Sequence, residues 1–385
     1  MHIAVLTGGG DVPGLNPAIK AIVTEASARG WNVTGFRRGW AGPLNCDLDN
    51  PEASSDWVTA LGPDVVRHID RTGGTVLHTT RTNPSNVRAG ELPDFLRSKY
   101  SKAGEMDMVD CTEHVLAVLT ALKVDVLIAI GGDDTLSYAA RLFDEGVPTM
   151  CIPKTMDNDV FGTDYCIGFS TCVNRSVDFI NRLRTPAGSH ERFLVVEMFG
   201  RNSGESALIT GYLSDADRTL IAEVPFDIER VAQLLEADRE RNSSHYAIVV
   251  VSEGASPKGG AVLESGEADA FGHRKLGGIG RAVGDALKER TGVDVMVQSL
   301  AYLVRAGMPD AMDLMVGRNF GTMTIQLIEA GKSGLMTAIQ DGRYTTEAAD
   351  ICTRGKRNVD VAAMYDPEAY HPRIAQVSGM PMFLK

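Results

Sequence analysis

The sequence predicts an α/β fold built on mostly parallel sheets. Short apolar runs rich in β-branched residues alternate with longer segments of helical spacing, and this alternation is typical of strands joined by helical crossovers. Two runs, VDVLIAI at 124–130 and YAIVVVS at 246–252, are almost continuously apolar. Strands of a parallel sheet show this pattern because helices cover both faces. A chain of 385 residues accommodates two domains or one large one.

The first half opens with a buried strand at 3–7, the glycine-rich turn GGGDVPG and a helix at 15–28. Apolar spacing then predicts the following elements: a strand at 33–36, a helix at 107–122, a strand at 124–130, a helix at 136–144 and a strand at 149–153.

The second half repeats the alternation. It predicts helices at 166–183, 203–213 and 275–290 and strands at 193–198, 246–252 and 293–300. Residues 256–273 are rich in glycine and polar side chains, so a surface loop is expected there. The last forty residues carry the weakest pattern.

Composition narrows the functional classes. The chain is 44% hydrophobic and 23% charged, as in globular proteins, and its net charge of −12 argues against a general nucleic-acid binder. Its six cysteines show no CxxC pair or zinc spacing, so buried free thiols are expected. There is no basic, apolar leader and no run of 18 apolar residues, which predicts no membrane partner and a cytoplasmic location.

Two glycine-rich loops follow predicted strands, where ligands bind in open α/β sheets. The first, GGGD at 8–11, lets the backbone approach an anion, or is simply a tight turn. It matches neither GxGxxG nor the Walker A spacing, which argues against a nicotinamide dehydrogenase and a P-loop enzyme. The second loop places Asp133 and Asp134 after two glycines. These carboxylates suit a magnesium ion, or one of them caps the helix.

Two further strand-end loops are strongly polar. PKTMDND at 153–159 holds a lysine, a hydroxyl and carboxylates within a few residues. This set suits phosphate binding, proton transfer and metal binding, or is a solvated loop. FGRNSG at 199–204 offers a guanidinium and backbone groups to a sugar or phosphate, or starts a helix with a serine cap.

Taken in order, these loops resemble the phosphofructokinase family over roughly residues 1–320. The resemblance rests on the following strings: LTGGGDVPGLNPAIK, TRTNP, IGGDDT, PKTMDNDVFGTDYCIGFST, NRLRTPAGSHER, VVEMFGR, VSEGA and LVRAG. PKTMDND followed by GTDY and IGF is the most specific of them. The family transfers a terminal phosphoryl group to the C1 hydroxyl of a sugar phosphate.

The resemblance implies a role for individual residues. Asp157 is the expected base, and the other expected catalytic residues are Lys154, Thr155, Asp159 and Arg201. Asp133 is expected to bind Mg²⁺. The expected donor-binding residues are Gly10, Arg81, Asp134, Thr135 and Lys154. The expected substrate-binding residues are Thr155, Asp157, Arg192, Phe199, Gly200, Arg201, Glu253, Tyr302 and Arg305.

The resemblance also implies the architecture. It predicts two Rossmann-like three-layer α/β/α domains with the active site in the cleft between them. Residues 1–165 and 303–345 would bind donor and metal, whereas 166–302 and 346–385 would bind the sugar phosphate. Arg192 resembles an arginine that acts from a neighbouring subunit, so a homodimer or homotetramer is expected.

The donor is expected to be pyrophosphate rather than ATP. ATP-using bacterial relatives usually carry glycine at the positions of Asp134 and Lys154. A carboxylate at 134 would crowd and repel the α-phosphate of a nucleotide, whereas pyrophosphate ends before that point. Lys154 would add positive charge near the leaving phosphate. The lysine alone is a weaker indication, because some ATP-dependent relatives share it.

The sequence departs from the family at the acceptor side. Met296 stands where relatives often carry an arginine for the acceptor's phosphate, and Tyr302 replaces a frequent histidine. Either another basic residue substitutes, such as Lys356 or Arg357 in the tail, or the acceptor differs. Fructose 6-phosphate is the leading acceptor, with sedoheptulose 7-phosphate or another sugar as alternatives. An ATP-dependent 6-phosphofructokinase and a non-catalytic sugar-phosphate sensor are the other hypotheses.

Overall fold

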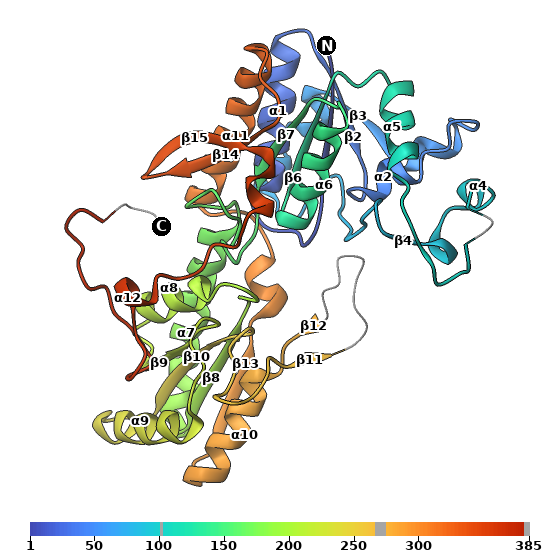
Figure 1. Cartoon of the computed structure of the whole chain (residues 1–385). Helices are drawn as coiled ribbons and strands as arrows, with labels where there is room; N and C mark the ends of the chain where they lie inside the picture. The colour runs from blue at the N-terminus through green and yellow to red at the C-terminus, as the bar shows by residue number, and fades with distance from the viewer. Residues whose placement is uncertain (101–102, 266–274, 381–385) are drawn as a thin grey trace.

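The computed structural model of the chain describes residues 1–100, 103–265 and 275–380 and consists of two α/β parts (Figure 1). Within these ranges, a seven-stranded sheet draws its strands from both ends of the chain, and a four-stranded sheet draws its strands from the middle. The predicted fold class, α/β with mostly parallel sheets, is confirmed.

The larger sheet has the strand order β15-β14-β7-β6-β1-β2-β3. Its strands are parallel except the two edges, where β3 and β15 run antiparallel to their neighbours β2 and β14. The strands are β1 (His2–Thr7), β2 (Asn32–Phe36), β3 (Val58–Leu61), β6 (Val126–Gly131), β7 (Thr149–Pro153), β14 (Leu335–Gln340) and β15 (Arg343–Ala348).

Helices cover both faces of this sheet. Along β1, Ile3 and Val5 belong to one buried core, whereas Ala4 and Leu6 belong to another, as the period of two requires. The helices are α1 (Leu15–Ala28) and α11 (Ala311–Glu329) on the first face and α5 (Thr112–Ala121) and α6 (Asp133–Asp144) on the second. The apolar runs of the sequence are therefore buried on both sides.

The smaller sheet is entirely parallel, in the order β13-β8-β10-β9. Its strands are β8 (Phe193–Met198), β9 (Arg218–Leu220), β10 (Ala247–Ser252) and β13 (Val295–Ser299). Its helices are α7 (Phe169–Ser189), α8 (Glu205–Leu213), α9 (Ile228–Arg241) and α10 (Ile279–Thr291). One core contains Ile128 of the larger sheet and Val196 of the smaller one, so the two parts share buried apolar contacts.

Four predicted helices begin later than expected. The helix predicted at 203–213 starts at Glu205, and the other three differ by more. The helix predicted at 107–122 starts at Thr112, because Met108–Val109 forms β5 and pairs with β4 (Val87–Arg88). The helix predicted at 166–183 starts after Gly168, whose φ is +103°. The helix predicted at 275–290 starts after Gly278, whose φ is +95°. Glycine adopts such backbone readily, and the chain turns there into the helix.

The last strand of the larger sheet extends past residue 345, while the predicted division into two domains stays a prediction. The boundary expected at 345 falls within β15, which pairs with β14 along its whole length. Residues 346–348 therefore belong to the larger sheet. Of the loop predicted at 256–273, the described part ends in β11 (Glu264–Ser265), which pairs with β12 (Lys275–Leu276); residues 266–273 lie outside the described residues.

Shorter elements complete the described chain. They are α2 (Ala41–Leu44), α3 (Pro63–Val66), α4 (Asp94–Arg97), α12 (Val361–Met364), β16 (Tyr365–Asp366), β17 (His371–Pro372), and the 3-10 turns η1 (Ala53–Asp56), η2 (Ile69–Arg71), η3 (Ala89–Glu91), η4 (Ala301–Arg305) and η5 (Ala349–Thr353). All six cysteines are buried free thiols, as predicted. No helix among the described residues has the length and apolarity to cross a membrane.

Candidate active site

One cavity brings together loops from both parts of the molecule. It lies at the carboxyl ends of β6 and β7 in the larger sheet and of β8 and β10 in the smaller one. Parallel strands present these ends at one edge, so residues far apart in the sequence meet there. The predicted site residues that line the cavity are Gly10, Arg81, Asp133, Asp134, Thr135, Lys154, Thr155, Asp157, Asp159, Phe199, Arg201, Glu253 and Arg305.

The first glycine loop is held against the start of α6. The Gly8 amide donates to the Ile130 carbonyl and the Gly9 amide to the Thr80 carbonyl, each at 3.0 Å. A Cβ atom at Gly8 would lie 2.5 Å from Oγ1 of Thr135. Gly9 has a φ of +79°, a conformation that favours glycine. The loop therefore needs glycine for close packing and for its turn.

Asp133 and Asp134 occupy the first turn of α6. Gly132 is the N-cap residue, so the alternative of an aspartate cap is wrong. Negative charge at this end of a helix is stabilised by the free backbone N–H groups. The Asp133 carboxylate forms an ion pair with Lys356 across the cavity wall.

Lys154 is buried beside the glycine loop. Its amide donates to the Gly131 carbonyl at 2.9 Å, and a Cβ atom at Gly9 would lie 3.1 Å from its Nζ. Burial, together with the nearby guanidinium groups of Arg305 and Arg81, lowers the pKa of Lys154 to about 8. A buried ammonium directed at a glycine-rich loop is well placed for an anion such as phosphate.

Asp157 is a half-buried carboxylate that lines the cavity. Its Oδ2 lies 3.5 Å from the Arg201 amide, and its Oδ1 is buried without a hydrogen-bond partner among the described residues. Burial raises the pKa of Asp157 well above its usual value, and the charges of Asp159 and Glu253 raise it further. An unpaired buried oxygen with raised basicity suits a general base that awaits a substrate hydroxyl.

Asn158 locks the loop that carries Asp157. Its φ is +57°, and its Oδ1 accepts from the Cys166 amide at 2.7 Å. Its Nδ2 donates to the Asp164 carbonyl at 3.0 Å and to Glu205 Oε1 at 3.1 Å. Asparagine tolerates left-handed backbone better than most residues do, so this position holds a sharp turn between Asp157 and Asp159.

The second part of the molecule supplies polar groups to the same space. Asn202 donates to Asp159 Oδ2 at 3.2 Å. Burial raises the pKa of Glu253 to about 7, and its amide donates to the Met198 carbonyl at 2.9 Å. Arg305 Nε donates to the Asp11 carbonyl at 2.8 Å, and the guanidinium lies 5.8 Å from the Phe199 ring centre.

Three predicted substrate residues do not line the cavity. Gly200, with a φ of +137°, packs on Ser252 behind the cavity wall. Tyr302 is 73% exposed, and its ring lies 5.0 Å from the Arg305 guanidinium. Arg192 precedes β8 and is half exposed, 3.8 Å from Asp294. Met296 lies within β13, partly buried against the core.

Five other residues line the cavity without an assigned role at this site. They are Gly9, Gly132, Met156, Asn202 and Lys356. The first four belong to predicted loops. The sequence suggests Lys356 and Arg357 of the tail only as a source of charge for the acceptor's phosphate. For Arg357 this hypothesis is wrong, because its guanidinium is buried in an ion pair with Glu205. Lys356 pairs instead with the predicted metal ligand.

Comparisons with known proteins found a matching family model and similar proteins. A family model described as Phosphofructokinase matches residues 2–328. A pyrophosphate–fructose 6-phosphate 1-phosphotransferase of Amycolatopsis methanolica is 41% identical over 342 residues, which cover 88% of this chain and 91% of that protein. An ATP-dependent 6-phosphofructokinase of Corynebacterium efficiens is 37% identical over 345 residues, 89% of this chain and 91% of that protein.

The fold also matches a solved structure. The crystal structure of a pyrophosphate-dependent phosphofructokinase from Nitrosospira multiformis aligns with a TM-score of 0.74 at 16% identity. The match covers 100% of this chain and 95% of that chain. At this level of identity the likeness concerns the fold alone.

Proposed function

The chain belongs to the phosphofructokinase family, and from this premise we propose that it transfers a phosphoryl group reversibly from pyrophosphate to the C1 hydroxyl of fructose 6-phosphate. The observation that carries the proposal is the position of Asp157. Its unpaired Oδ1 is buried in the same cavity as the cations Lys154, Arg201 and Arg305. A proton acceptor and anion-binding groups thus share one space.

The chemistry follows from this arrangement. Asp157 Oδ1 accepts the proton of the C1 hydroxyl. At the same time the hydroxyl oxygen forms a bond to phosphorus, the bridging P–O bond of pyrophosphate breaks, and phosphate leaves. The raised pKa of Asp157 makes it a stronger base than an ordinary aspartate. In the reverse direction the protonated carboxyl returns this proton. Lys154 and Arg201 hold peripheral phosphate oxygens, whose negative charge is spread in the transition state.

Asp133 fits a magnesium ion. No group of three carboxylate, histidine or cysteine ligands occurs within the described part of the chain. Mg²⁺ needs no such cage, because it is usually bound by one or two carboxylates together with waters and substrate phosphates. Asp133 lines the cavity and would hold the ion. When bound, the ion would neutralise charge on the phosphate oxygens.

Proteins with pyrophosphate-dependent and with ATP-dependent names are both similar to this chain, so the names alone do not distinguish the donors. We therefore assign the donor from Asp134 and Lys154. Asp134 lies in the cavity wall at the start of α6. Two like charges about 4 Å apart repel by about 4 kcal/mol at the effective dielectric constant of a protein surface. Such a repulsion would exclude the α-phosphate of a nucleotide but would spare pyrophosphate.

A matrix of donors and acceptors tests the proposal. Initial rates with Mg²⁺ are measured for pyrophosphate, ATP and ADP against fructose 6-phosphate, sedoheptulose 7-phosphate and unphosphorylated sugars. We expect turnover with pyrophosphate and a sugar phosphate. Sedoheptulose 7-phosphate is the second candidate acceptor, because Met296 offers no charge to the acceptor's phosphate. Turnover with ATP but not with pyrophosphate would overturn the donor assignment.

The role of Asp134 has its own variant. Asp134→Gly is expected to gain ATP-dependent activity, because the substitution removes both the charge and the bulk. Asp144→Gly, at the exposed opposite end of α6, is the matched control and should leave donor preference unchanged. A folded Asp134→Gly protein without any ATP activity would show that this carboxylate does not select the donor.

A further inference from the structure

We propose that the Lys356 ammonium is ion-paired with the Asp133 carboxylate in the free enzyme. When the metal–donor complex binds, the metal replaces the ammonium at Asp133, and the ammonium binds the donor's phosphates instead. This inference rests on the proposed function, because it concerns the metal and donor of the same reaction. It assigns the C-terminal segment a direct part in donor binding. The evidence is the path of the chain near residue 356 and the contact that its side chain makes.

The backbone around Lys356 is clamped to the catalytic loop. Lys356 forms an antiparallel bridge with Val160, and the Arg357 amide donates to the Asp159 carbonyl at 3.0 Å. Asp159 and Val160 directly follow the turn that carries Asp157. The segment is therefore held against this loop, although it belongs to the last thirty residues of the chain.

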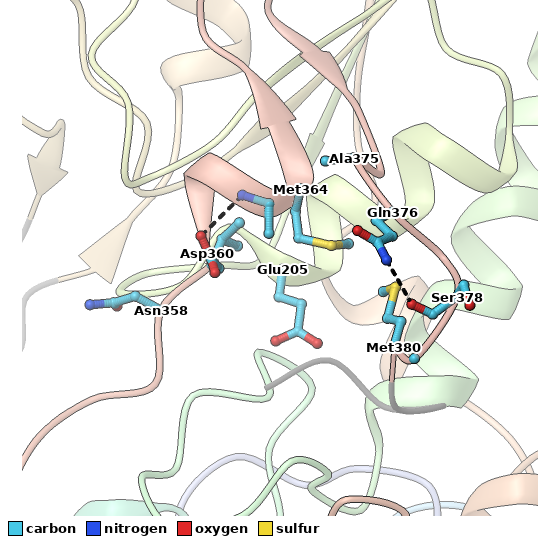
Figure 2. A pocket seen from close by; sticks show the side chains of 11 residues that line it. Glu205, Asn358, Asp360, Met364, Ala375, Gln376, Ser378 and Met380 are labelled. Carbon is cyan, nitrogen blue, oxygen red and sulfur yellow. Dashed lines mark hydrogen bonds between the residues drawn. The ribbon is translucent and has the colours of Figure 1, made fainter.

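Arg357 fixes the direction of its neighbour. Its guanidinium pairs with Glu205 of α8, and its Nη1 donates to the Asn158 carbonyl at 3.0 Å. Glu205 and Asn358, the residue after Arg357, line a separate, largely apolar cavity of about 310 Å³ beside α12 (Figure 2). Consecutive side chains of extended backbone point to opposite sides. With Arg357 turned into the protein, Lys356 points into the active-site cavity, which it lines.

The ion pair with Asp133 is exchangeable. The side chains of Lys356 and Asp133 are 34% and 24% exposed, so water and ions reach the contact. Two adjacent carboxylates at the start of α6 favour a cation, and the Lys356 ammonium supplies one in the absence of metal. A free divalent ion must displace this ammonium. A metal–diphosphate complex also offers phosphate oxygens, which become the new acceptors of the Lys356 N–H groups.

Binding of Mn²⁺, a paramagnetic substitute for Mg²⁺, tests the first half of the proposal. Free Mn²⁺ is counted by electron paramagnetic resonance in the absence of donor. Lys356→Met keeps the length of the side chain and removes its charge, so it should bind Mn²⁺ about fivefold more tightly or better. Lys356→Arg should bind it as weakly as the unmodified protein. Arg354→Met, in the same segment but paired with exposed Asp350, is the matched control and should change nothing.

The second half is tested by steady-state kinetics on the same proteins. Lys356→Met should raise the KM for the magnesium–pyrophosphate complex roughly tenfold, because a charged hydrogen bond to phosphate is lost. Unchanged or weaker Mn²⁺ binding by folded Lys356→Met would overturn the proposal, as would an unchanged KM. Asp133→Asn is expected to lose Mn²⁺ binding. If it binds Mn²⁺ normally, the metal assignment itself is wrong, an outcome distinct from a failure at Lys356.

Discussion

Replacement of Asp157 by asparagine separates its catalytic role from its cost to stability. The substitution keeps the size of a half-buried side chain whose Oδ1 is buried, and it removes the charge and basicity of that side chain. A positioned general base contributes about 10²–10⁴-fold to a rate, so kcat should fall by this factor. The loss corresponds to about 2.7–5.4 kcal/mol of activation free energy.

The same substitution should stabilise the folded protein at neutral and alkaline pH. Burial, Asp159 and Glu253 raise the pKa of Asp157 above that of an unfolded aspartate. The folded state therefore binds more protons between the unfolded and folded pKa values, and stability falls as pH rises through that window. Asp157→Asn removes this loss. Its free energy of unfolding should exceed that of the unmodified protein at pH 8 by more than it does at pH 5.

Initial rates at saturating substrates and urea unfolding at the two pH values measure both effects. Asp159→Asn is the matched control, since it also removes a buried carboxylate of the same loop but leaves the base. We expect it to lower kcat less than Asp157→Asn does. A kcat within threefold of the unmodified protein would refute the role of Asp157 as base. A folded Asp157→Asn protein with lower stability at pH 8 would refute the electrostatic reasoning.

Three further outcomes are expected. Because the pKa of Lys154 is lowered to about 8, kcat/KM for the donor should fall as pH rises through that value, and Lys154→Arg should move the fall to higher pH in a pH–rate profile. Glu205→Gln should lower the free energy of unfolding in urea by about 3–5 kcal/mol, because the buried guanidinium of Arg357 loses its carboxylate; a loss below 1 kcal/mol would contradict this. If Arg192 acts across a subunit interface, mixing inactive Arg192→Ala and Asp157→Asn proteins should restore activity. A mixed oligomer would then contain one site with both Asp157 and Arg192 intact. No recovery would indicate that Arg192 acts within its own subunit.

Local sequence determined most of what surrounds the reacting groups. The bounds of α1, β7 and β8 agree with their predicted ranges, because their apolar spacing and flanking turns are encoded within each segment. The glycine and aspartate loops after β1, β6 and β7 could also be located, since each directly follows a buried strand. Their convergence on one cavity follows from the common direction of parallel strands.

The starts of α5, α7 and α10 required the tertiary structure. Apolar spacing continues before each of them, but pairing of Met108–Val109 with β4 and positive φ at Gly168 and Gly278 delay the helices. Whether a short segment forms a helix or a strand depends on the segments it packs against, and a single sequence does not show those contacts.

Only the folded chain decided which distant groups complete the site. Lys356 lies more than two hundred residues after Asp133 in the sequence, and no spacing rule connects them. Lys356 reaches the cavity because Arg357 forms an ion pair with Glu205 and because the backbone of Lys356 forms a β-bridge with Val160. Strand-end loops are local features that a sequence can reveal, whereas a crossing of the tail over the catalytic loop depends on contacts between segments that are remote along the chain.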